Sequence, residues 1–446
     1  MKKTDIIFSF DTEDFTSSTA ADAIFREAEI LREEGVRGGF CIVGLLAKQL
    51  KAWGRNDIRE ALGHHDILTH SYGHSLHPTI NEYTDIADFR AASNELLRQE
   101  REGIRMITEF TGRTDILGAC PPGNQKSYVA MYTYKDMGLP IYADTFCDTE
   151  NGRGVYYCNI YHTSYAFSLE HFLGTDDSDE EMRRILDVLS RRERAICYTH
   201  PNMAMYEDFW DRVNYNKENK HLFGEWEEAP RLPVEKTERF YDSIRRFIRL
   251  IKSDERFRIT SYGELAERLR AEPPRRVSRD DLPRIKEELR RSLGPIASPS
   301  LSVADVFLAC RAFLLGEDTH TGGRVHGFLE APHAVSEPLT VTREEMIASA
   351  PAIDPEEFLP PAIRVGEVTL GPADWLMAAL DILTGDERAT VLPKPQLPSL
   401  DMLPGLKAPS LYPGWLQSDR FEDCFLSERL RLQSWTMRFL DRAANA

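Results

Sequence analysis

The sequence lacks a long apolar run. None of its segments reaches the roughly 18 consecutive apolar residues that a membrane-spanning helix needs. The first residues, MKKTDIIFSFDTED, begin with basic residues, but Asp5 and Asp11 interrupt the apolar stretch that a secretory signal peptide requires. We therefore predict that this segment is a first strand, and we expect a cytoplasmic protein with neither a signal peptide nor a membrane span.

The sequence also lacks a disulfide framework and an excess of positive charge. The seven cysteines are scattered, odd in number and never spaced as CxxC, which favours reduced and mostly buried thiols. The 55 Lys and Arg residues against 72 Asp and Glu residues give a net charge of −17. An acidic surface repels phosphate backbones and anionic lipids, so nucleic acid and membrane partners are not expected. A neutral or amino-sugar substrate is not repelled, and the oligomeric state stays open.

The first 270 residues or so alternate short apolar runs with longer amphipathic stretches, which predicts a parallel sheet or a barrel. The expected strands are 6–11, 38–44, 66–71, 116–120, 141–144, 155–169 in two pieces, 195–200 and 257–261. The expected helices are 20–34, 58–62, 84–110, 128–137, 180–192 and 238–252. The polar and aromatic segment 203–233 is predicted to be a long loop or lid beside the strand 195–200.

A proline- and arginine-rich break, EPPRRVSR at 272–279, separates a different second part. We expect residues 1–272 to form a catalytic domain that holds the complete metal site, and residues 280–446 to form a smaller, mostly α-helical accessory domain. Residues 301–317 and 370–386 are an internal repeat at a 69-residue offset, and each copy predicts one amphipathic helix. A final helix is expected from about 428 to 441.

Three predicted strands end in titratable side chains. The first ends at Asp11, followed by Glu13 and Asp14, the second at His70, with His74 four residues later, and the third at His200. Reacting groups collect at the carboxyl ends of parallel strands in barrels. Two imidazoles at i and i+4, on one face of a turn that enters a helix, together with a carboxylate, can hold a catalytic metal and leave a position open. A second carboxylate and a further histidine can then act as base and acid.

Each element also has a purely structural interpretation. DTED can cap a helix, HxxxH arises by chance, and a histidine at the end of a strand is most often a loop residue. The three strand ends together favour the metal site. Imidazole and carboxylate ligands suit zinc or a close relative better than calcium.

Four motifs, SFDTED, HSYGH, CPPGNQ and YTHP, occur in an order and spacing that resembles the polysaccharide deacetylase (NodB-homology) family. The resemblance covers about 270 residues. It implies a deformed (β/α) barrel of about seven strands and a divalent metal, most simply Zn²⁺. It also implies that Asp11 is the base, that His70 and His74 are metal ligands and that His200 is the acid. The spacing D-T-E-D leaves two candidates for the metal carboxylate, Asp14 and, as the alternative, Glu13.

The third motif departs from the family pattern. Ala119 or Cys120 stands where the family usually has an arginine beside its Pro-Gly turn, which puts the tuning of Asp11 in doubt. Asp144 resembles the aspartate that follows the next strand and is a candidate orienting group. In the second part, residues 359–383 faintly resemble pseudomurein-binding-type repeats, with a plain helical packing domain as the alternative.

The resemblance predicts a metal-dependent hydrolase of non-peptide C–N bonds that removes an acetyl group from an N-acetylated sugar. Two alternatives remain. One is a catalytically silent carbohydrate-binding protein, which the missing arginine favours. The other is a hydrolase of the same fold that acts on a small non-sugar amide, which suits the absence of a signal peptide.

Overall fold

The computed structural model describes residues 3–144, 151–171, 177–402, 404–407, 411 and 414–440. The chain forms two compact units. The first consists of residues 1–154, 162–270 and 408–426, and the second of residues 155–161, 271–407 and 427–446. This division differs from the one expected from the sequence in two short segments. Residues 155–161 belong to the second unit, and residues 408–426 belong to the first.

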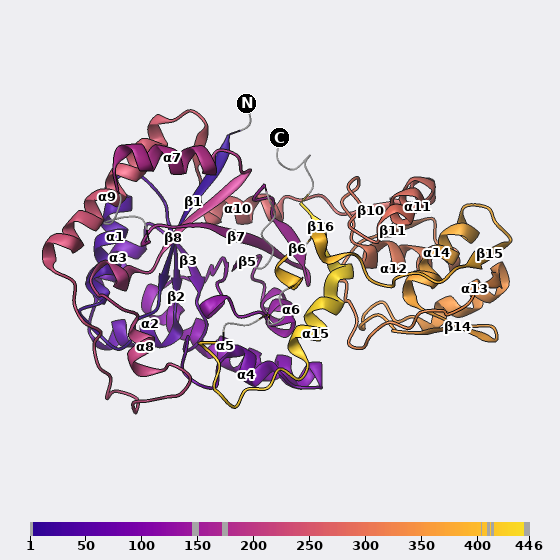
Figure 1. Ribbon diagram of the computed structural model, residues 1–446, viewed down its shortest axis with the longest axis horizontal. Coiled ribbons are helices and arrows are strands. Elements are labelled where there is room, and N and C mark those ends of the chain that lie inside the picture. Colours follow the sequence, from indigo (N-terminus) through magenta and orange to yellow (C-terminus); the bar gives the residue numbers. More distant parts are fainter. Residues whose placement is uncertain are drawn as a thin grey trace. The chain divides into compact units, whose positions relative to one another are not determined.

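The first unit contains a closed barrel of seven parallel strands (Figure 1). Its strands, in spatial order, are β7 (Ile160–Ser168), β5 (Ile141–Asp144), β4 (Gly118–Ala119), β3 (Asp66–Thr69), β2 (Gly39–Ile42), β1 (Thr4–Thr12) and β8 (Arg194–Thr199). The pairing of β7 with β8 closes the ring, and β9 (Phe257–Ile259) adds to β1. This architecture confirms the predicted seven-stranded (β/α) barrel.

Helices cover the outside of the barrel (Figure 1). They are α1 (Ala21–Glu33), α2 (Gly44–Ala52), α3 (Asn56–Leu62), α4 (Ile80–Thr84), α5 (Phe89–Thr111), α6 (Tyr128–Asp136), α7 (Asp179–Leu189), α8 (Trp210–Asn214), α9 (Val234–Ser253) and α10 (Tyr262–Arg270). Helix α5 shows why these elements form where they do. Its N-cap Asp88 accepts the N–H of Ala91, its apolar stripe is buried, and Gly112 ends it at φ 74°.

Several of these helices differ from the sequence-based prediction. Residues 44–52 form α2 directly after β2, whereas the strand was expected to continue to Gly44. The predicted helix 84–110 corresponds to α5, which begins only at Phe89, and the separate helix α4, which ends at Thr84, was not predicted. Helix α10 was not predicted at all.

The second unit combines helices with short strand pairs. Its helices are α11 (Leu282–Arg291), α12 (Val303–Leu314), α13 (Arg343–Ser349), α14 (Pro372–Leu383) and α15 (Leu426–Leu432), which begins at the last residue of the first unit. Its strand pairs are β10 (Arg276–Ser278) with β11 (Thr319–Thr321), β12 (Leu339–Thr342) with β15 (Arg388–Val391), β13 (Ile363–Val365) with β14 (Val368–Leu370), and β6 (Val155–Tyr157) with β16 (Arg438–Phe439).

The two copies of the repeat form α12 and α14, whose buried Phe307 and Trp375 rings lie 4.7 Å apart. The expected linker contains β10, and Val277 is buried in the core of the second unit. The expected helix 428–441 is instead α15, then a 3-10 turn over Gln433–Thr436 and β16, while residue 441 lies outside the described residues.

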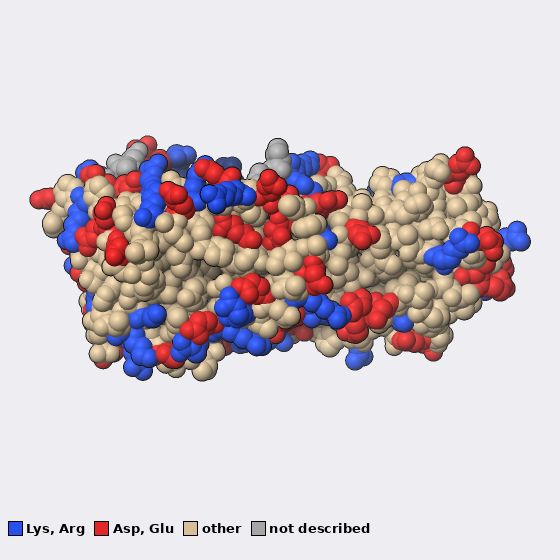
Figure 2. Space-filling model, turned by 90° about the horizontal axis from the view of Figure 1, so that it is seen from below, with Lys and Arg blue, Asp and Glu red and all other residues tan. Residues whose placement is uncertain are grey.

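The surface and the thiols agree with the composition. On the face in Figure 2, Lys and Arg side chains are interspersed with Asp and Glu side chains. Among the described cysteines none forms a disulfide and Cys424 is the exposed one, as expected for reduced, mostly buried thiols, whereas Cys147 lies outside the described residues. No helix in the described part of the chain has both the length and the apolarity to cross a bilayer.

Candidate metal centre and active site

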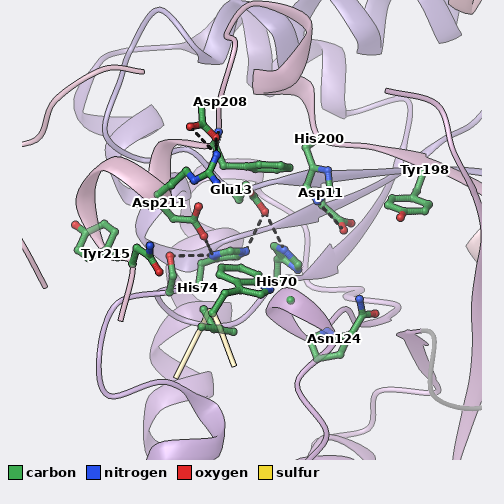
Figure 3. Close-up of a pocket in the computed structure, with 18 of the residues that line it drawn as sticks. Asp11, Glu13, His70, His74, Asn124, Tyr198, His200, Asp208, Asp211 and Tyr215 are labelled. Carbon is green, nitrogen blue, oxygen red and sulfur yellow. Dashed lines mark hydrogen bonds and ion pairs between the residues drawn. The ribbon is translucent and has the colours of Figure 1, made fainter. Parts of the chain in front are cut away.

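The three predicted strand ends meet in one pocket of the first unit (Figure 3). The pocket has a volume of about 490 Å³, within the range of about 300–1,000 Å³ that is typical of small-molecule sites. It is lined by Asp11 and Glu13 from the end of β1, His70 and His74 after β3, and His200 after β8. The barrel therefore brings together five of the six side chains singled out in the sequence.

Glu13 lies between the two histidines. Its Oε2 is 2.9 Å from Nε2 of His74 and 3.4 Å from Nε2 of His70 (Figure 3). All three side chains are buried, and one potential ligand atom from each lies within 4.8 Å of the others. Glu13, His70 and His74 can therefore hold a metal ion.

Asp14 is not part of this cluster, although we favoured it as the metal carboxylate. Its Oδ1 accepts hydrogen bonds from the N–H and hydroxyl of Thr16, at 2.9 and 2.7 Å, and from the N–H of Ser17 at 3.2 Å. Burial raises its pKa to about 7 against these hydrogen bonds. Asp14 thus closes the turn after β1, and the structure brings the alternative carboxylate, Glu13, to the histidines.

The two histidines are brought together by a turn, as expected, but this turn does not lead directly into a helix. Residues 70–79 contain no helix, and both Ser71 and His74 adopt left-handed backbone conformations, with φ of 67° and 52°. The hydroxyl of Ser71 accepts the N–H of His74 at 3.0 Å. Non-glycine residues rarely adopt this conformation, and it occurs often at ligand-binding sites where the surroundings enforce it. As a result, the two imidazole rings lie 4.9 Å apart.

Neighbouring helices hold this turn in place. The first N–H groups of α2, those of Gly44 and Leu45, donate to the carbonyls of Ser71 and Tyr72 at 2.9 Å. The N–H of Tyr72 donates to the buried carboxylate of Glu100 on α5 at 3.1 Å. Gly103 of α5 allows the close approach, because a Cβ there would lie 3.0 Å from the Cα of Tyr72.

The bonding of His70 fits a metal ligand. Its Nδ1 lies 2.8 Å from the carbonyl oxygen of Cys120, and because a carbonyl can only accept, Nδ1 carries the hydrogen. The other ring nitrogen, Nε2, is buried and faces Oε2 of Glu13 at 3.4 Å, so it is the atom that is available to a metal ion. Metal-bound histidines commonly donate their other N–H to a carbonyl in this way.

The surroundings of Glu13 keep it ionised. Burial opposes ionisation, but His74, His200 and the hydrogen bonds of both site histidines hold the pKa of Glu13 well below its usual range. The indole N–H of Trp210 donates to Glu13 Oε1 at 3.0 Å, which leaves Oε2 toward the histidines. Asp211, the next residue, lies 3.7 Å from Nδ1 of His74, and burial raises its pKa to about 6.

Asp11 and His200 form a second pair in the same pocket. Oδ1 of Asp11 accepts the hydroxyl hydrogen of Tyr165 at 2.9 Å, and its Oδ2 lies 3.8 Å from Nε2 of His200. His200 donates through Nδ1 to Glu170 at 2.9 Å, and its backbone N–H donates to the same carboxylate at 2.8 Å. Burial would lower the pKa of His200, but the charges of Glu170, Glu13 and Asp11 raise it well above its ordinary value. The imidazole is therefore a proton donor beside a carboxylate.

The third motif contributes backbone groups and a thiol. Pro121, Gly123 and Asn124 line the pocket, while Cys120 provides the carbonyl that orients His70. The Cys120 thiol lies close to Asp11 and to Cys41 of β2. Asp144 pairs with the buried His162 at 3.3 Å and is not among the residues that line the pocket.

Sequence reasoning missed four residues of the site: Tyr165, Glu170, Trp210 and Asp211. Tyr165 lies in the predicted strand pair 155–169, and Glu170 is the residue directly after it. Trp210 and Asp211 belong to the segment 203–233 that was predicted to be a loop or lid. The abundance of aromatic and acidic residues in segment 203–233 was the one available signal, and its short helix α8 indeed borders the pocket.

No family model and no curated protein matches the sequence. Solved structures with similarity to the chain include polysaccharide deacetylases, allantoinase and a glucanotransferase. A protein described as a polysaccharide deacetylase from Mycobacterium smegmatis is 17% identical, with a TM-score of 0.39 over 61% of this chain and 92% of that chain. The 4-alpha-glucanotransferase from Thermococcus litoralis is 11% identical, with a TM-score of 0.41 over 60% and 40% of the two chains. Puue allantoinase is 14% identical, with a TM-score of 0.37 over 60% and 90%.

Similarities this low do not distinguish among the activities of these proteins. They also offer no support for the resemblance of residues 359–383 to pseudomurein-binding-type repeats.

Proposed function

We propose that this chain is a metal-dependent hydrolase of non-peptide amide bonds, and that it removes the acetyl group from an N-acetylated sugar. One observation carries the proposal. A buried cluster suited to a divalent ion, Glu13–His70–His74, shares a pocket with a carboxylate and a proton-donating imidazole, Asp11 and His200. Metal-assisted hydrolysis of an amide uses these groups: a metal ion as the electrophile, a base and an acid.

Glu13, His70 and His74 would hold the metal, with zinc or a close relative as the ion that suits these ligands. When bound, a divalent ion polarises an amide carbonyl and lowers the pKa of water. The buried Asp11 carboxylate, oriented by Tyr165, accepts a proton from the attacking water. His200 donates its proton to the leaving nitrogen as the C–N bond breaks, which yields acetate and a free amine.

Metal analysis combined with acetate release tests the proposal. We expect about one divalent ion per purified chain, acetate release from at least one N-acetylated sugar in a panel, loss of release after chelation and recovery with zinc. The same panel should include small cyclic amides, because these separate sugar deacetylation from hydrolysis of a non-sugar amide. A protein without bound metal would contradict the proposal.

A catalytically silent carbohydrate-binding protein is the second candidate. The observation that favours it is the absence of the expected arginine at Ala119 or Cys120, so that a tyrosine hydroxyl is the group that orients Asp11. Bound metal and sugar binding without release of acetate or of any other product from the panel would support this alternative.

Glu170 offers a test of the role of His200. Glu170→Gln keeps the shape of the side chain but removes the charge that raises the pKa of His200. An acid must be protonated, so activity falls as pH rises through this pKa. The variant should therefore lose activity at a lower pH than the wild type, with a decrease in kcat of about tenfold or more.

A pH–rate profile of both proteins, with metal content as the control, measures this effect. Glu170 acts through His200 and does not touch the metal cluster, so bound metal should not change. An alkaline limb at the same pH in both proteins would show that His200 is not the acid.

A further inference from the structure

A segment from far along the chain reaches the pocket. Residues 414–426 belong to the first unit, although the chain before them, from residue 271 to 407, belongs to the second. We refer to residues 414–426 as the strap. Trp415 and Leu416 of the strap line the same pocket as the metal cluster and the Asp11–His200 pair.

The strap is fixed at two points to the barrel side of the first unit. Near its beginning, Glu82 of α4 accepts the N–H of Ser418 at 2.7 Å, and the buried Gln417 accepts the hydroxyl of Thr79 at 2.8 Å. Burial opposes the ionisation of Glu82, but hydrogen bonds from His77, Thr79 and Ser418 lower its pKa to about 2. The anchor is thus an ionised carboxylate.

At its other end the strap is held by Asp85, just after α4. The two oxygens of Asp85 accept the N–H groups of Cys424, Phe425 and Leu426 at 2.7, 2.8 and 3.2 Å. Hydrogen bonds to a charged acceptor are stronger than those between neutral groups. Hydrogen bonds at both ends therefore hold the strap in place as part of the pocket wall.

Trp415 is prepared to bind a ligand. Leu416 beside it is buried, whereas Trp415 is 46% exposed. A large aromatic side chain that lines a pocket and keeps much of its surface open offers a flat apolar face and one N–H donor.

The charges of the pocket limit what this face can bind. Four carboxylates line it, Asp11, Glu13, Asp208 and Asp211, and the one arginine among the lining residues, Arg212, is paired with Asp208 at 3.1 Å. These carboxylates offer several hydrogen-bond acceptors to a ligand in the pocket. A neutral ring with one apolar face and several hydroxyl donors fits, because the hydroxyls can donate to carboxylates while the apolar face packs on the indole.

We propose that the strap supplies the substrate-binding wall of this site, and that Trp415 packs against the ring of a neutral, N-acetylated amino sugar. The inference rests on the proposed function and narrows it to a small substrate or the end of a chain, since the cavity of about 490 Å³ is of small-molecule size. Trp415 determines substrate affinity and takes no part in the chemistry.

Direct binding of N-acetylglucosamine and its β-1,4-linked dimer, measured by calorimetry, tests the inference with a measurement that does not require acetate release. Trp415→Ala should raise the Kd for the sugar by about tenfold, because the apolar contact between the indole and the sugar ring is lost. Trp415→Phe should restore most of the affinity, because a flat ring remains. Trp53→Ala is the matched control, since Trp53 lies at the end of α2 outside the pocket.

Asp85→Ala tests the anchoring by itself. Asp85 touches the strap but does not line the pocket, so the variant should raise Kd for the sugar while leaving the bound metal unchanged. Thermal unfolding of each variant identifies any variant that fails to fold. If Trp415→Ala does not fold, the Kd of Trp415→Phe is compared with that of the wild type, because phenylalanine keeps most of the bulk of the side chain.

The outcomes separate this inference from the proposed function. Sugar binding that depends on Trp415 supports the strap even if no acetate is released. Acetate release with unchanged KM and Kd in Trp415→Ala would overturn the role of the strap and leave the proposed function intact. A wild-type protein that binds neither sugar would overturn the inference.

Discussion

Glu13→Gln should remove the bound metal and, with it, all measurable hydrolysis. Glu13 is buried, its Oε2 faces the Nε2 atoms of both histidines, and its other oxygen is occupied by Trp210. A glutamine of the same shape lacks the negative charge that strengthens the binding of a divalent ion. We expect metal affinity to fall by more than about 100-fold, because even the outer partners of metal ligands change affinity by about 10- to 100-fold. Metal analysis after dialysis against a defined free zinc concentration measures the effect.

Asp14→Asn is the matched control, one position further along the chain. Its Oδ1 serves Thr16 and Ser17, and an asparagine oxygen can accept the same hydrogen bonds. Metal content should therefore stay close to that of the wild type. If Asp14→Asn lost the metal and Glu13→Gln kept it, Asp14 and not Glu13 would be the metal ligand.

Asp11→Asn should abolish most turnover while the metal stays bound. The side chain contacts Tyr165 and approaches His200, and it is not part of the Glu13–His70–His74 cluster. An asparagine keeps the hydrogen bond from Tyr165 but cannot take a proton from water. General acid–base groups contribute about 10²- to 10⁴-fold, so kcat should fall by that factor.

Parallel measurement of kcat and metal content decides the role of Asp11. Tyr165→Phe is the companion variant, because it removes the hydroxyl that orients Asp11 but keeps the base, and its effect on kcat should be smaller. Loss of metal in Asp11→Asn would identify Asp11 as a ligand, and unchanged kcat would exclude it as the base.

The barrel could be predicted from the sequence because each strand carries a local signal. Strands β1, β3 and β8 are mostly apolar runs. Asp11 is the last residue but one of β1, and His70 and His200 directly follow β3 and β8, and parallel strands place such ends at one edge. The boundaries were less accurate where elements follow one another without a turn residue. The apolar run into Gly44 gave no sign that β2 ends at Ile42 and that a helix begins two residues later.

The choice between Glu13 and Asp14 could not be made from the sequence. Adjacent residues after a strand point in different directions, and the outcome depends on Thr16, Ser17 and Trp210, which fix the two carboxylates. The geometry of the histidine pair was unpredictable for a related reason. The spacing at i and i+4 predicted a turn that enters a helix, whereas the turn observed has left-handed Ser71 and His74 and the next helix begins at Ile80.

The remaining site residues depend on contacts between distant segments. Glu170 reaches His200 across 30 positions, and Trp210 reaches Glu13 across 197. The Thr79–Gln417 hydrogen bond spans 338 positions. No local pattern encodes such pairs, so the strap in particular could be found only in the folded structure.

The late position of the strap has a consequence for how the protein matures. Domains generally fold in order as the chain leaves the ribosome. The three candidate ligands and the Asp11–His200 pair are synthesised before residue 272, so we expect that a nascent chain can form the metal cluster while Trp415 has yet to be translated. The second unit must be made before the pocket wall can dock on Glu82 and Asp85. Ribosomes that stall within residues 271–407 would therefore release fragments that can take up metal but hold sugar poorly.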